Sequence, residues 1–460
     1  MTPSACDRSR LSPGIVHLGL GNFARAHLAA CTEAALHAGA PPHWGILGVS
    51  LRHAGVRDAL AARQGRYTLV LRDDQGEHRQ EIGCVLGCLV APEDPVAVLD
   101  RMADEATRIV SLTVTEKGYC HDPASGELNP AHGDIVHDLA HPQAPRSAPG
   151  FIVHGLARRR AAGRGGLTLM SLDNLPANGR LLRGVVLALA RRIDTALPDW
   201  IARHCRFPCS MVDRIVPRTD GELAAEPFFD WAVEDDFAAG RPDWTAGGAR
   251  FVADAAPWEQ RKLRLVNGAH SCIAYLGVAA GWPTVDAAVA QPGMRRFLQT
   301  FWHDEVAPTL RNQVEIATTG ERLLHRFANP ALAHATLQIA MDGSQKLPQR
   351  LLGTVRDRLA SGDHIDALAL GVAAWCQHLR GHDDAGRAYV LDDPLAPALQ
   401  AWQAMAQALP DDAARAAHFT RFGPVFGDLA DAPGLVAALA PALGRLRERG
   451  AAATLQAAWP

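Results

Sequence analysis

Four polar side chains between Pro257 and His270 recur at helical spacing. They are Glu259, Lys262, Asn267 and His270, with apolar residues between them. At about 100° per residue of a regular α-helix, their positions fall within an arc of roughly 140°. An amphipathic helix facing solvent would show the same spacing, whereas the flanking leucines and valine favour a partly buried face. We therefore expect four polar groups that face one place.

This set can move a proton to or from a hydroxyl group. Burial lowers the pKa of a lysine, so Lys262 can serve as a general base near neutral pH. His270 can orient the same hydroxyl, and Asn267 can donate a hydrogen bond to an oxygen that gains negative charge. Glu259, about one turn before Lys262, is expected to pair with it or to relay its proton. The chemistry indicated is hydride transfer at a secondary alcohol or a ketone.

A further candidate donor follows an apolar run. The run from Leu167 to Ser171 predicts a strand, and Asn174 comes directly after it. Ligands of open α/β sheets bind beyond the carboxyl ends of the strands, which favours a binding role for Asn174. An asparagine that closes an Asx-turn in a loop is the competing interpretation.

The cofactor signal lies near the N-terminus. An apolar run, Ile15 to Leu18, leads into Gly19-Leu20-Gly21, and the residues from Ala24 to His37 predict a helix. Glycines at such a turn let the backbone approach a pyrophosphate at the start of the helix. Taken alone, an ordinary strand-to-helix turn would look the same.

The choice between NAD and NADP is less clear. Dinucleotide folds that bind NAD carry an acid after the second strand, for the adenosine ribose. The segment from Val49 to His53 supplies none. We expect NAD with NADP not excluded, and Arg52 or Arg57 would meet a 2′-phosphate unless both are solvated loop residues.

The order of the elements predicts the fold class. Short apolar runs at 45–49, 68–71, 108–114 and 167–171 alternate with helical stretches, as in a mostly parallel, doubly wound α/β sheet. From about Pro257 onward, long Ala/Leu-rich segments with helical spacing dominate. We therefore predict an α/β domain over residues 1–255 and a mainly α-helical domain over residues 256–460.

Composition excludes several function classes. The chain has 460 residues and a formal net charge of −3, with no basic stripe, so nucleic acid is not an expected partner. No apolar run is long enough for a membrane span, and the N-terminus lacks the apolar core of a signal peptide, so a cytoplasmic location is expected. The nine cysteines include two pairs four residues apart, Cys84 with Cys88 and Cys205 with Cys209, which lack the spacing of a zinc knuckle. No metal is expected.

Several separated motifs together resemble the mannitol dehydrogenase family, the long-chain, metal-independent polyol and sugar-acid dehydrogenases. The motifs are His17 to His27, Ser111 to Tyr119, Asp173-Asn174, Phe207 to Thr219, the helix with Lys262, Asn267 and His270, and Asp342 to Pro348. They span most of the chain in the order found in the family.

The resemblance implies a Rossmann-type N-terminal domain, a helical C-terminal domain and a zinc-free active site between them. It implies that Lys262 is the general acid/base, that Asn174 and Asn267 form the oxyanion site and that His270 binds the reacting hydroxyl. The residues implied in substrate binding are Asp213 and Lys346, and those implied in cofactor binding are Gly19, Gly21, Phe23, Arg25 and Thr115. We add two further candidates for substrate binding: Gln338, which stands where sugar-alcohol oxidisers of the family often carry arginine, and the cation Arg350. The loop departs from the family pattern at Ala24, where the family usually has histidine.

Within the family, the sequence segments at 113–120, 207–209, 241–244 and 338–346 resemble those of the branch that reduces D-fructuronate to D-mannonate. Lys346 and Arg350 are candidate partners for the substrate carboxylate, or else surface charges at a helix end. The alternative activity is oxidation of mannitol, arabinitol or sorbitol to a ketose. A catalytically silent nucleotide- or sugar-binding regulator is a third reading, which the complete catalytic set disfavours. The expected partner is a small sugar acid or polyol, and the expected assembly is a monomer or small homo-oligomer.

Overall fold

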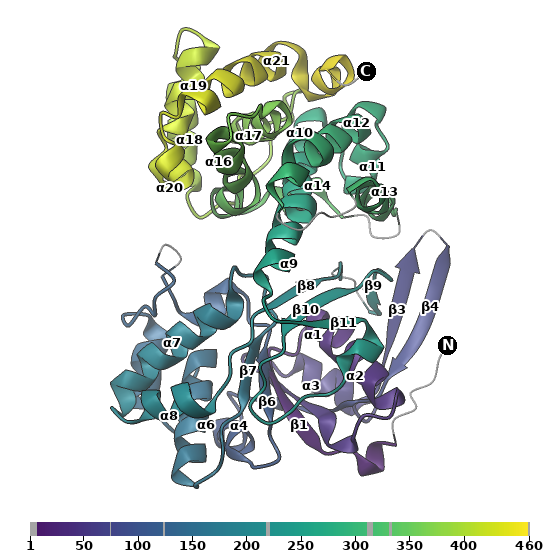
Figure 1. Cartoon of the computed structure of the whole chain (residues 1–460), viewed down its shortest axis with the longest axis vertical. Helices are drawn as coiled ribbons and strands as arrows, with labels where there is room; N and C mark the ends of the chain where they lie inside the picture. The colour runs from purple at the N-terminus through teal and green to yellow at the C-terminus, as the bar shows by residue number, and fades with distance from the viewer. Residues whose placement is uncertain are drawn as a thin grey trace. The chain divides into compact units, whose positions relative to one another are not determined.

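The computed structural model describes residues 7–73, 75–122, 125–217, 221–310, 316–330 and 334–458. The chain divides into two compact units, Met1–Glu259 and Gln260–Pro460 (Figure 1). The division falls inside helix α9 (Ala256–Arg261), a few residues after the boundary predicted at 255/256. No helix in the described ranges is both long and apolar enough to cross a membrane.

The first unit is built on a parallel sheet of five strands in the order β5-β2-β1-β6-β7. The strands are β1 (Pro13–Leu18), β2 (Gly45–Ser50), β5 (Val85–Val90), β6 (Ile109–Leu112) and β7 (Thr168–Ser171). The chain runs outward from β1 to one edge and then returns to the other side of β1 at β6. This order confirms the predicted doubly wound fold, and it places a switch point between β1 and β6, where such sheets bind ligands.

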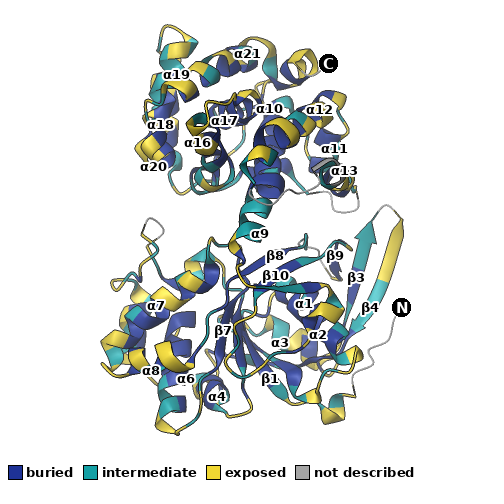
Figure 2. Ribbon diagram, in the orientation of Figure 1, coloured by how far each residue is buried: buried dark blue, intermediate teal, exposed yellow. Residues whose placement is uncertain are grey.

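Helices cover both faces of this sheet. They are α1 (Asn22–Ala26), α2 (Leu28–His37), α3 (Gly55–Ala61), α4 (Pro95–Ala103), α5 (Gly133–Ala140), α6 (Ala148–Ala161), α7 (Asn178–Ile193) and α8 (Leu197–His204). Val16 and Leu18 pack into one core with α4, α6 and α7, while Ile15 packs into another with α2. Strands buried on both faces account for the continuous apolar runs in the sequence (Figure 2).

Two smaller sheets complete the first unit. One is β11-β10-β8, from β8 (Ser210–Asp213), β10 (Asp230–Glu234) and β11 (Ala249–Val252), and the other is β4-β3-β9, from β3 (Tyr67–Asp73), β4 (Gly76–Ile82) and β9 (Leu223–Ala225). The run at 68–71 is thus a strand of a separate hairpin sheet, and the third strand of the parallel sheet is β5. The prediction was wrong there because an apolar run does not reveal its partner strand.

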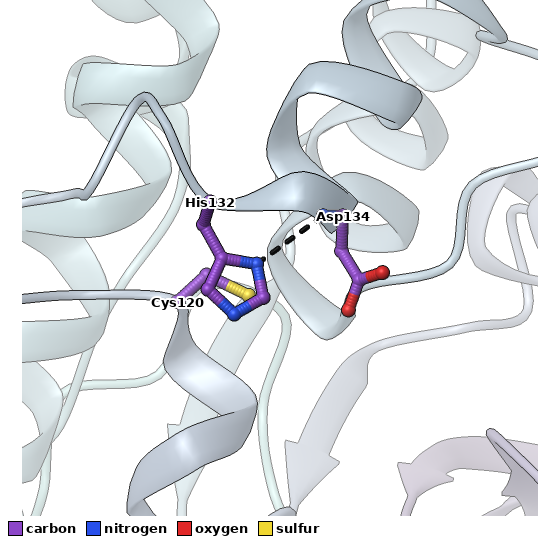
Figure 3. A group of neighbouring side chains, drawn as sticks. All are labelled: Cys120, His132 and Asp134. Atoms are coloured by element: carbon purple, nitrogen blue, oxygen red, sulfur yellow. Dashed lines mark hydrogen bonds between the residues drawn. The ribbon is translucent and has the colours of Figure 1, made fainter.

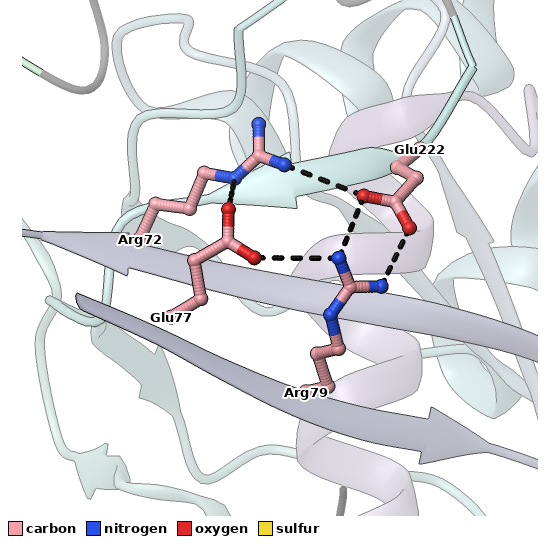
Figure 4. A network of polar contacts seen from close by, with 4 residues as sticks. All are labelled: Arg72, Glu77, Arg79 and Glu222. Atoms are coloured by element: carbon pink, nitrogen blue, oxygen red, sulfur yellow. Dashed lines mark hydrogen bonds and ion pairs between the residues drawn. The ribbon is translucent and has the colours of Figure 1, made fainter.

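Exposed charges cover the β3–β4 hairpin. Arg72 bonds Glu77 at 2.6 Å, and Arg79 bonds Glu222, just before β9, at 2.6 Å (Figure 4). Pairs this exposed contribute little to stability. Charges along an edge strand do discourage pairing with another chain.

The second unit is mainly helical, as predicted. After a π-helical segment η5 (Lys262–Asn267) come α10 (Gly268–Ala280), α11 (Val285–Val289), α12 (Pro292–Thr300), the π-helix η6 (Phe301–Val306), α13 (Ile316–Phe327), α14 (Thr336–Ala340), α15 (Gly343–Leu347), the π-helix η8 (Pro348–Leu352), α16 (Gly353–Ala360), α17 (Asp366–His378), α18 (Ala396–Gln407), α19 (Asp412–Thr420), α20 (Gly423–Phe426) and α21 (Pro433–Ala458). Helices α10 and α17 are nearly all buried and lie at its centre.

Candidate active site

The glycine turn after β1 allows a close approach of two strand ends. Gly19 has a φ of +84°, and a Cβ on it would lie 2.2 Å from the carbonyl oxygen of Thr113 after β6. Its N–H donates to Val49 O at 2.8 Å. Gly21 is exposed, and α1 begins at the next residue. Only glycine fits at position 19, and the turn stands at the β1/β6 switch point, which fits a dinucleotide site.

Helix α1 ends earlier than predicted. His27 adopts φ −113° and ψ −79° and separates α1 from α2, so the continuous helix from Ala24 to His37 was a wrong prediction. The His27 ring is fully buried and stacks on Phe23 at 4.9 Å and on Phe229 at 4.5 Å between ring centroids. Packing of this ring against residues distant in sequence therefore overrides the local helical preference.

Phe23 and Arg25, both half-buried, lie on α1. The Arg25 guanidinium donates to Asn22 Oδ1 at 2.7 Å and lies 5.6 Å from the centroid of the Tyr67 ring. The Tyr67 hydroxyl in turn donates to Arg25 O at 2.8 Å. Arg25 is held beside the turn, with its pKa lowered by burial.

A buried carboxylate organises the loop after β6. Asp173 accepts the backbone N–H of Val114 at 3.0 Å, the N–H of Thr115 at 2.9 Å and the hydroxyl of Tyr119 at 2.8 Å. Thr115, which is exposed, takes a φ of +62°, an uncommon conformation for a β-branched residue. Burial raises the pKa of Asp173, and the three hydrogen bonds oppose that rise. Sequence reasoning gave Asp173 no role, since nothing local indicates its partners.

Asn174 is exposed in the loop between β7 and α7. Asn178 anchors that loop: its Nδ2 donates to the carbonyls of Asp173 at 3.0 Å and Ser210 at 2.8 Å, and its Oδ1 accepts the Ser210 N–H at 2.9 Å. Asp213 ends β8 and is 8% exposed. Asn174 thus stands at the carboxyl edge of the sheet on a backbone that Asn178 holds in place.

The segment with Lys262 is a π-helix, so the arc predicted for a regular α-helix was wrong. Gly268 N donates to Leu263 O, five residues back, where an α-helix would reach four. In a π-turn, residues five apart lie one turn from each other, so Lys262 and Asn267 share a face. In an α-helix they would diverge by about 140°. The wider turn brings the two groups together more closely than the sequence pattern indicated.

Packing explains where the π-turn occurs. The Trp302 indole N–H, from η6, donates to Leu265 O at 2.8 Å and satisfies a carbonyl of the widened segment. A Cβ on Gly268 would lie 3.0 Å from Arg350 O, so the start of α10 approaches η8 closely. The segment η5 thus contacts both of the other π-helical segments, η6 and η8.

Asn267 and His270 sit differently on this helix. Asn267 is 7% exposed, and its Nδ2 has no hydrogen-bond acceptor among the described residues. His270 is half-buried, with its ring 4.4 Å from that of Phe327 and 6.2 Å from that of His334. Lys262 is also half-buried. A buried amide donor without a protein acceptor is one that a ligand oxygen can satisfy.

Two cations lie together on α15 and η8. Lys346 Nζ donates to Met341 O at 2.5 Å and to Ile339 O at 3.3 Å, and lies 4.0 Å from an Asp342 carboxylate oxygen. Burial, with the nearby positive charge of Arg350, lowers the pKa of Lys346 to about 8. Arg350 Nη1 donates to Ser271 Oγ on α10 at 3.2 Å. Lys346 and Arg350 are therefore neighbours, and the negative charges of nearby aspartates also act on Lys346.

Gln338 is exposed on α14, one residue before the carbonyl that Lys346 contacts. A Cβ on Gly343 would lie 2.8 Å from the Tyr275 hydroxyl and 2.5 Å from Trp375 Nε1, so glycine is required where the chain turns into α15. Ser344 bonds Asp393 through its N–H at 2.7 Å and its hydroxyl at 2.6 Å. These contacts hold Lys346 in position.

One group has the donor atoms of a metal site. Cys120, His132 and Asp134 bring them within 4.8 Å of one another (Figure 3). His132 Nδ1 accepts the Asp134 N–H at 3.2 Å and caps α5, so this nitrogen is engaged by the helix terminus. Burial raises the pKa of the Cys120 thiol to about 12. The group fits a helix cap better than a metal site.

The end of β2 carries no acid. The Ser50 hydroxyl donates to His53 O at 2.6 Å, and Arg52 is exposed. Arg57 is paired with Asp58 at 2.8 Å and with Glu93. Of the two candidate arginines, Arg52 is the one not engaged by a carboxylate in the described ranges.

Comparison with known proteins identifies the family. Residues 13–246 match the mannitol dehydrogenase Rossmann domain, and residues 254–447 match the mannitol dehydrogenase C-terminal domain. D-mannonate oxidoreductase of Escherichia coli K12 is 41% identical over 97% of this chain and 95% of its own. Mannitol 2-dehydrogenase of Cereibacter sphaeroides is 37% identical over 99% of this chain and 98% of its own. Mannitol 2-dehydrogenase of Pseudomonas fluorescens, solved with NAD and D-mannitol, is 35% identical, with a TM-score of 0.87 over 99% of this chain and 96% of that one. The resemblance seen in the motifs is thus confirmed, and the chain belongs to the mannitol dehydrogenase family of polyol and sugar-acid dehydrogenases.

Proposed function

We propose that this enzyme catalyses the NAD(H)-dependent, metal-independent and reversible reduction of D-fructuronate to D-mannonate. The observation that carries the choice of a sugar acid is the pair of neighbouring cations, Lys346 and Arg350. Both are substantially buried, and the charge of Arg350 raises the electrostatic cost of charging Lys346. A substrate carboxylate would offset that cost, whereas a neutral polyol would not.

The use of lysine supports the same site. The chain has three lysines, Lys117, Lys262 and Lys346, among 46 lysine and arginine residues. Arginine keeps its proton at any working pH, whereas lysine can release it. In a chain that otherwise uses arginine, a lysine at 262 fits a group that must exchange a proton.

Each residue then has a defined task. When bound, NADH supplies a hydride to the ketone carbon, and NAD accepts it in the reverse direction. The Lys262 ammonium donates a proton to the oxygen that becomes the hydroxyl, and its amine removes that proton in the oxidation. The Asn267 amide, and the Asn174 amide that family resemblance assigns to the same task, would stabilise negative charge on that oxygen, while His270 orients it.

The remaining assignments follow the sequence motifs. Lys346 and Arg350 would bind the carboxylate, and Asp213 and Gln338 would contact substrate hydroxyls. Gly19, Gly21, Phe23, Arg25 and Thr115 would line the cofactor site. The β1/β6 switch point and the close approach at Gly19 support a dinucleotide there.

The test is the initial rate of NADH oxidation with D-fructuronate and, in parallel, with D-fructose. We expect fructuronate to be preferred in kcat/KM. Lys262→Ala and Lys262→Arg should both lose at least about 100-fold in kcat, because arginine keeps the charge but cannot exchange the proton. Turnover of fructose alone would identify a polyol 2-dehydrogenase, turnover of neither would favour a silent regulator, and an active Lys262→Arg enzyme would rule out the proton transfer.

A further inference from the structure

The second unit contains a pocket that none of the proposed catalytic, substrate or cofactor residues lines. It lies among α17, α18, α19 and α21 and has a volume of about 260 Å³. Sites for drug-sized ligands are commonly larger, so this pocket suits a small metabolite.

The floor of the pocket carries two buried amides. Gln403 of α18 is 7% exposed and Gln377 of α17 is 9% exposed, beside the apolar side chains of Phe419 and Leu443. Gln403 Oε1 is buried, and no donor in the described part of the chain reaches it. A buried carbonyl oxygen without a donor is unfavourable in the free protein. A ligand hydroxyl could supply the missing hydrogen bond.

Three arginines line the rim, and each is paired with a carboxylate, Arg447 with Glu448 as well as with Asp412. Arg380, Arg415 and Arg447 line the pocket together with a single carboxylate, Asp412. Arg415 Nη1 donates to Asp412 Oδ1 at 2.8 Å, and Arg447 Nη2 donates to Asp412 Oδ2 at 3.1 Å. The bonds from Arg447 and Arg415 lower the pKa of Asp412, so it stays ionised and orients both guanidinium groups.

Arg380 is oriented from the other side. Its Nε donates to Gln377 O at 3.1 Å, and its Nη2 donates to Asp384 Oδ1 at 3.2 Å. Guanidinium groups have five donors in a planar fork, and the hydrogen bonds described above leave some of these donors for a carboxylate or phosphate. The rim therefore offers oxyanion donors, and the floor offers an acceptor.

We propose that this pocket binds a small polyhydroxylated oxyanion, with its carboxylate or phosphate at the arginine rim and a hydroxyl donating to Gln403. The site is separate from the proposed substrate residues, and its occupation is independent of which substrate the enzyme reduces. A sugar acid and a sugar phosphate share this chemistry.

The experiment is isothermal titration calorimetry of the full chain with D-gluconate and with D-glucose 6-phosphate. We expect at least one to bind with a submillimolar Kd, and the one that binds identifies carboxylate or phosphate as the preferred group. Gln403→Leu and Arg447→Gln should each weaken that binding at least tenfold. Arg449→Gln, an exposed arginine of the same helix outside the pocket lining, is the matched control and should leave binding unchanged.

The melting temperature of the ligand-free Gln403→Leu protein gives a second readout. We expect it to stay equal to wild type or to rise, because the variant removes a buried oxygen that lacks a donor. Failure of both probes to bind, or binding that neither pocket variant changes, would overturn the proposal. So would a Gln403→Leu protein that melts well below wild type, since the amide would then be structural.

Discussion

At the residue scale, two buried asparagines differ in how their side chains are hydrogen-bonded. Asn178 has its Nδ2 and Oδ1 both engaged by backbone groups of two loops. Asn267 is also buried, at 7% exposure against 0% for Asn178, yet its Nδ2 has no acceptor among the described residues. A polar group buried without a partner destabilises the free protein, and we propose that a ligand oxygen satisfies Asn267.

The first prediction compares these two residues. Asn267→Leu should lower kcat by about 10²–10³-fold, because it removes a donor to the reacting oxygen. Its free energy of unfolding should stay unchanged or rise, since no existing bond of Nδ2 is lost. Asn178→Leu, the matched change, should destabilise the protein by about 3 kcal/mol or more. Urea unfolding and steady-state kinetics measure both, and a destabilised but fully active Asn267→Leu protein would contradict the argument.

The second prediction uses the pKa of Lys346, which lies at about 8 in the fold. Below that pH the ammonium is charged and binds a carboxylate, and above it the charge is lost. The Kd for D-mannonate should therefore rise between pH 7 and pH 9.5, by up to about tenfold per pH unit above 8. In Lys346→Arg the charge persists, and the rise should largely vanish.

Calorimetry at several pH values checks this expectation. D-mannitol, which has no carboxylate, serves as the control and should bind with little pH dependence from this source. An equal rise in Kd for mannitol and mannonate in wild type, or an unchanged rise in Lys346→Arg, would show that another group titrates.

At the element scale, the ends of strands position the proposed cofactor site. Gly19 after β1 and Thr115 after β6 take positive φ values. Both conformations depend on contacts with other segments of the chain as well as on the local sequence. The Asp173 carboxylate after β7 holds the loop after β6 through two backbone N–H groups and the Tyr119 hydroxyl. Three strand ends are therefore coupled, so that a change in one should alter the others.

The third prediction tests this coupling with Asp173→Asn. An amide has one acceptor oxygen, so its NH₂ group would face a backbone N–H or the tyrosine hydroxyl. We expect the free energy of unfolding to fall by about 1–3 kcal/mol. We also expect the KM for NADH to rise about tenfold as the Thr115 loop loosens. Asp100→Asn removes one partner of an exposed ion pair with Arg158 and is the control. It should leave the free energy of unfolding and the KM for NADH nearly unchanged. Normal NADH affinity in Asp173→Asn would show that the loop does not form the cofactor site.

At the scale of the whole molecule, the two units have separate hydrophobic cores. The two cores of the first unit draw their buried residues from Ile15 to Ala249, and that of the second from Leu265 to Leu455. Each unit thus buries its own apolar surface, which is the main stabilising contribution to a fold.

The fourth prediction is that calorimetric unfolding shows two transitions. NADH at 100 times its Kd should raise the free energy of unfolding of the first unit by about 2.7 kcal/mol, and with it the temperature of that transition. The transition temperature of the second unit should change much less. Adding NADH at several concentrations assigns the transitions. A single transition, or equal shifts of both, would show that the units unfold as one.

Much of the architecture was predictable because its causes are local. Apolar runs predict strands buried on both faces, and the glycine turn after Leu18 needs a residue without Cβ. The run at 68–71 was correctly a strand but was assigned to the wrong sheet, since pairing depends on distant residues. The break at His27 was missed because its stacking partner Phe229 lies about 200 residues away in the chain.

The candidate site also has some features that the sequence predicts and others that only the tertiary structure shows. The sequence by itself determined which residue types are present and in what order, including the family motifs and the lysines at 262 and 346. Only the tertiary structure decided that Lys262 and Asn267 share a face, because Trp302 and the backbone of Arg350 pack against η5 and accommodate its wider turn. Only the tertiary structure placed the Asp173 carboxylate on the loop after β6. Local preferences extend over one turn of helix or a few residues of strand, whereas these arrangements depend on contacts between segments far apart in the chain.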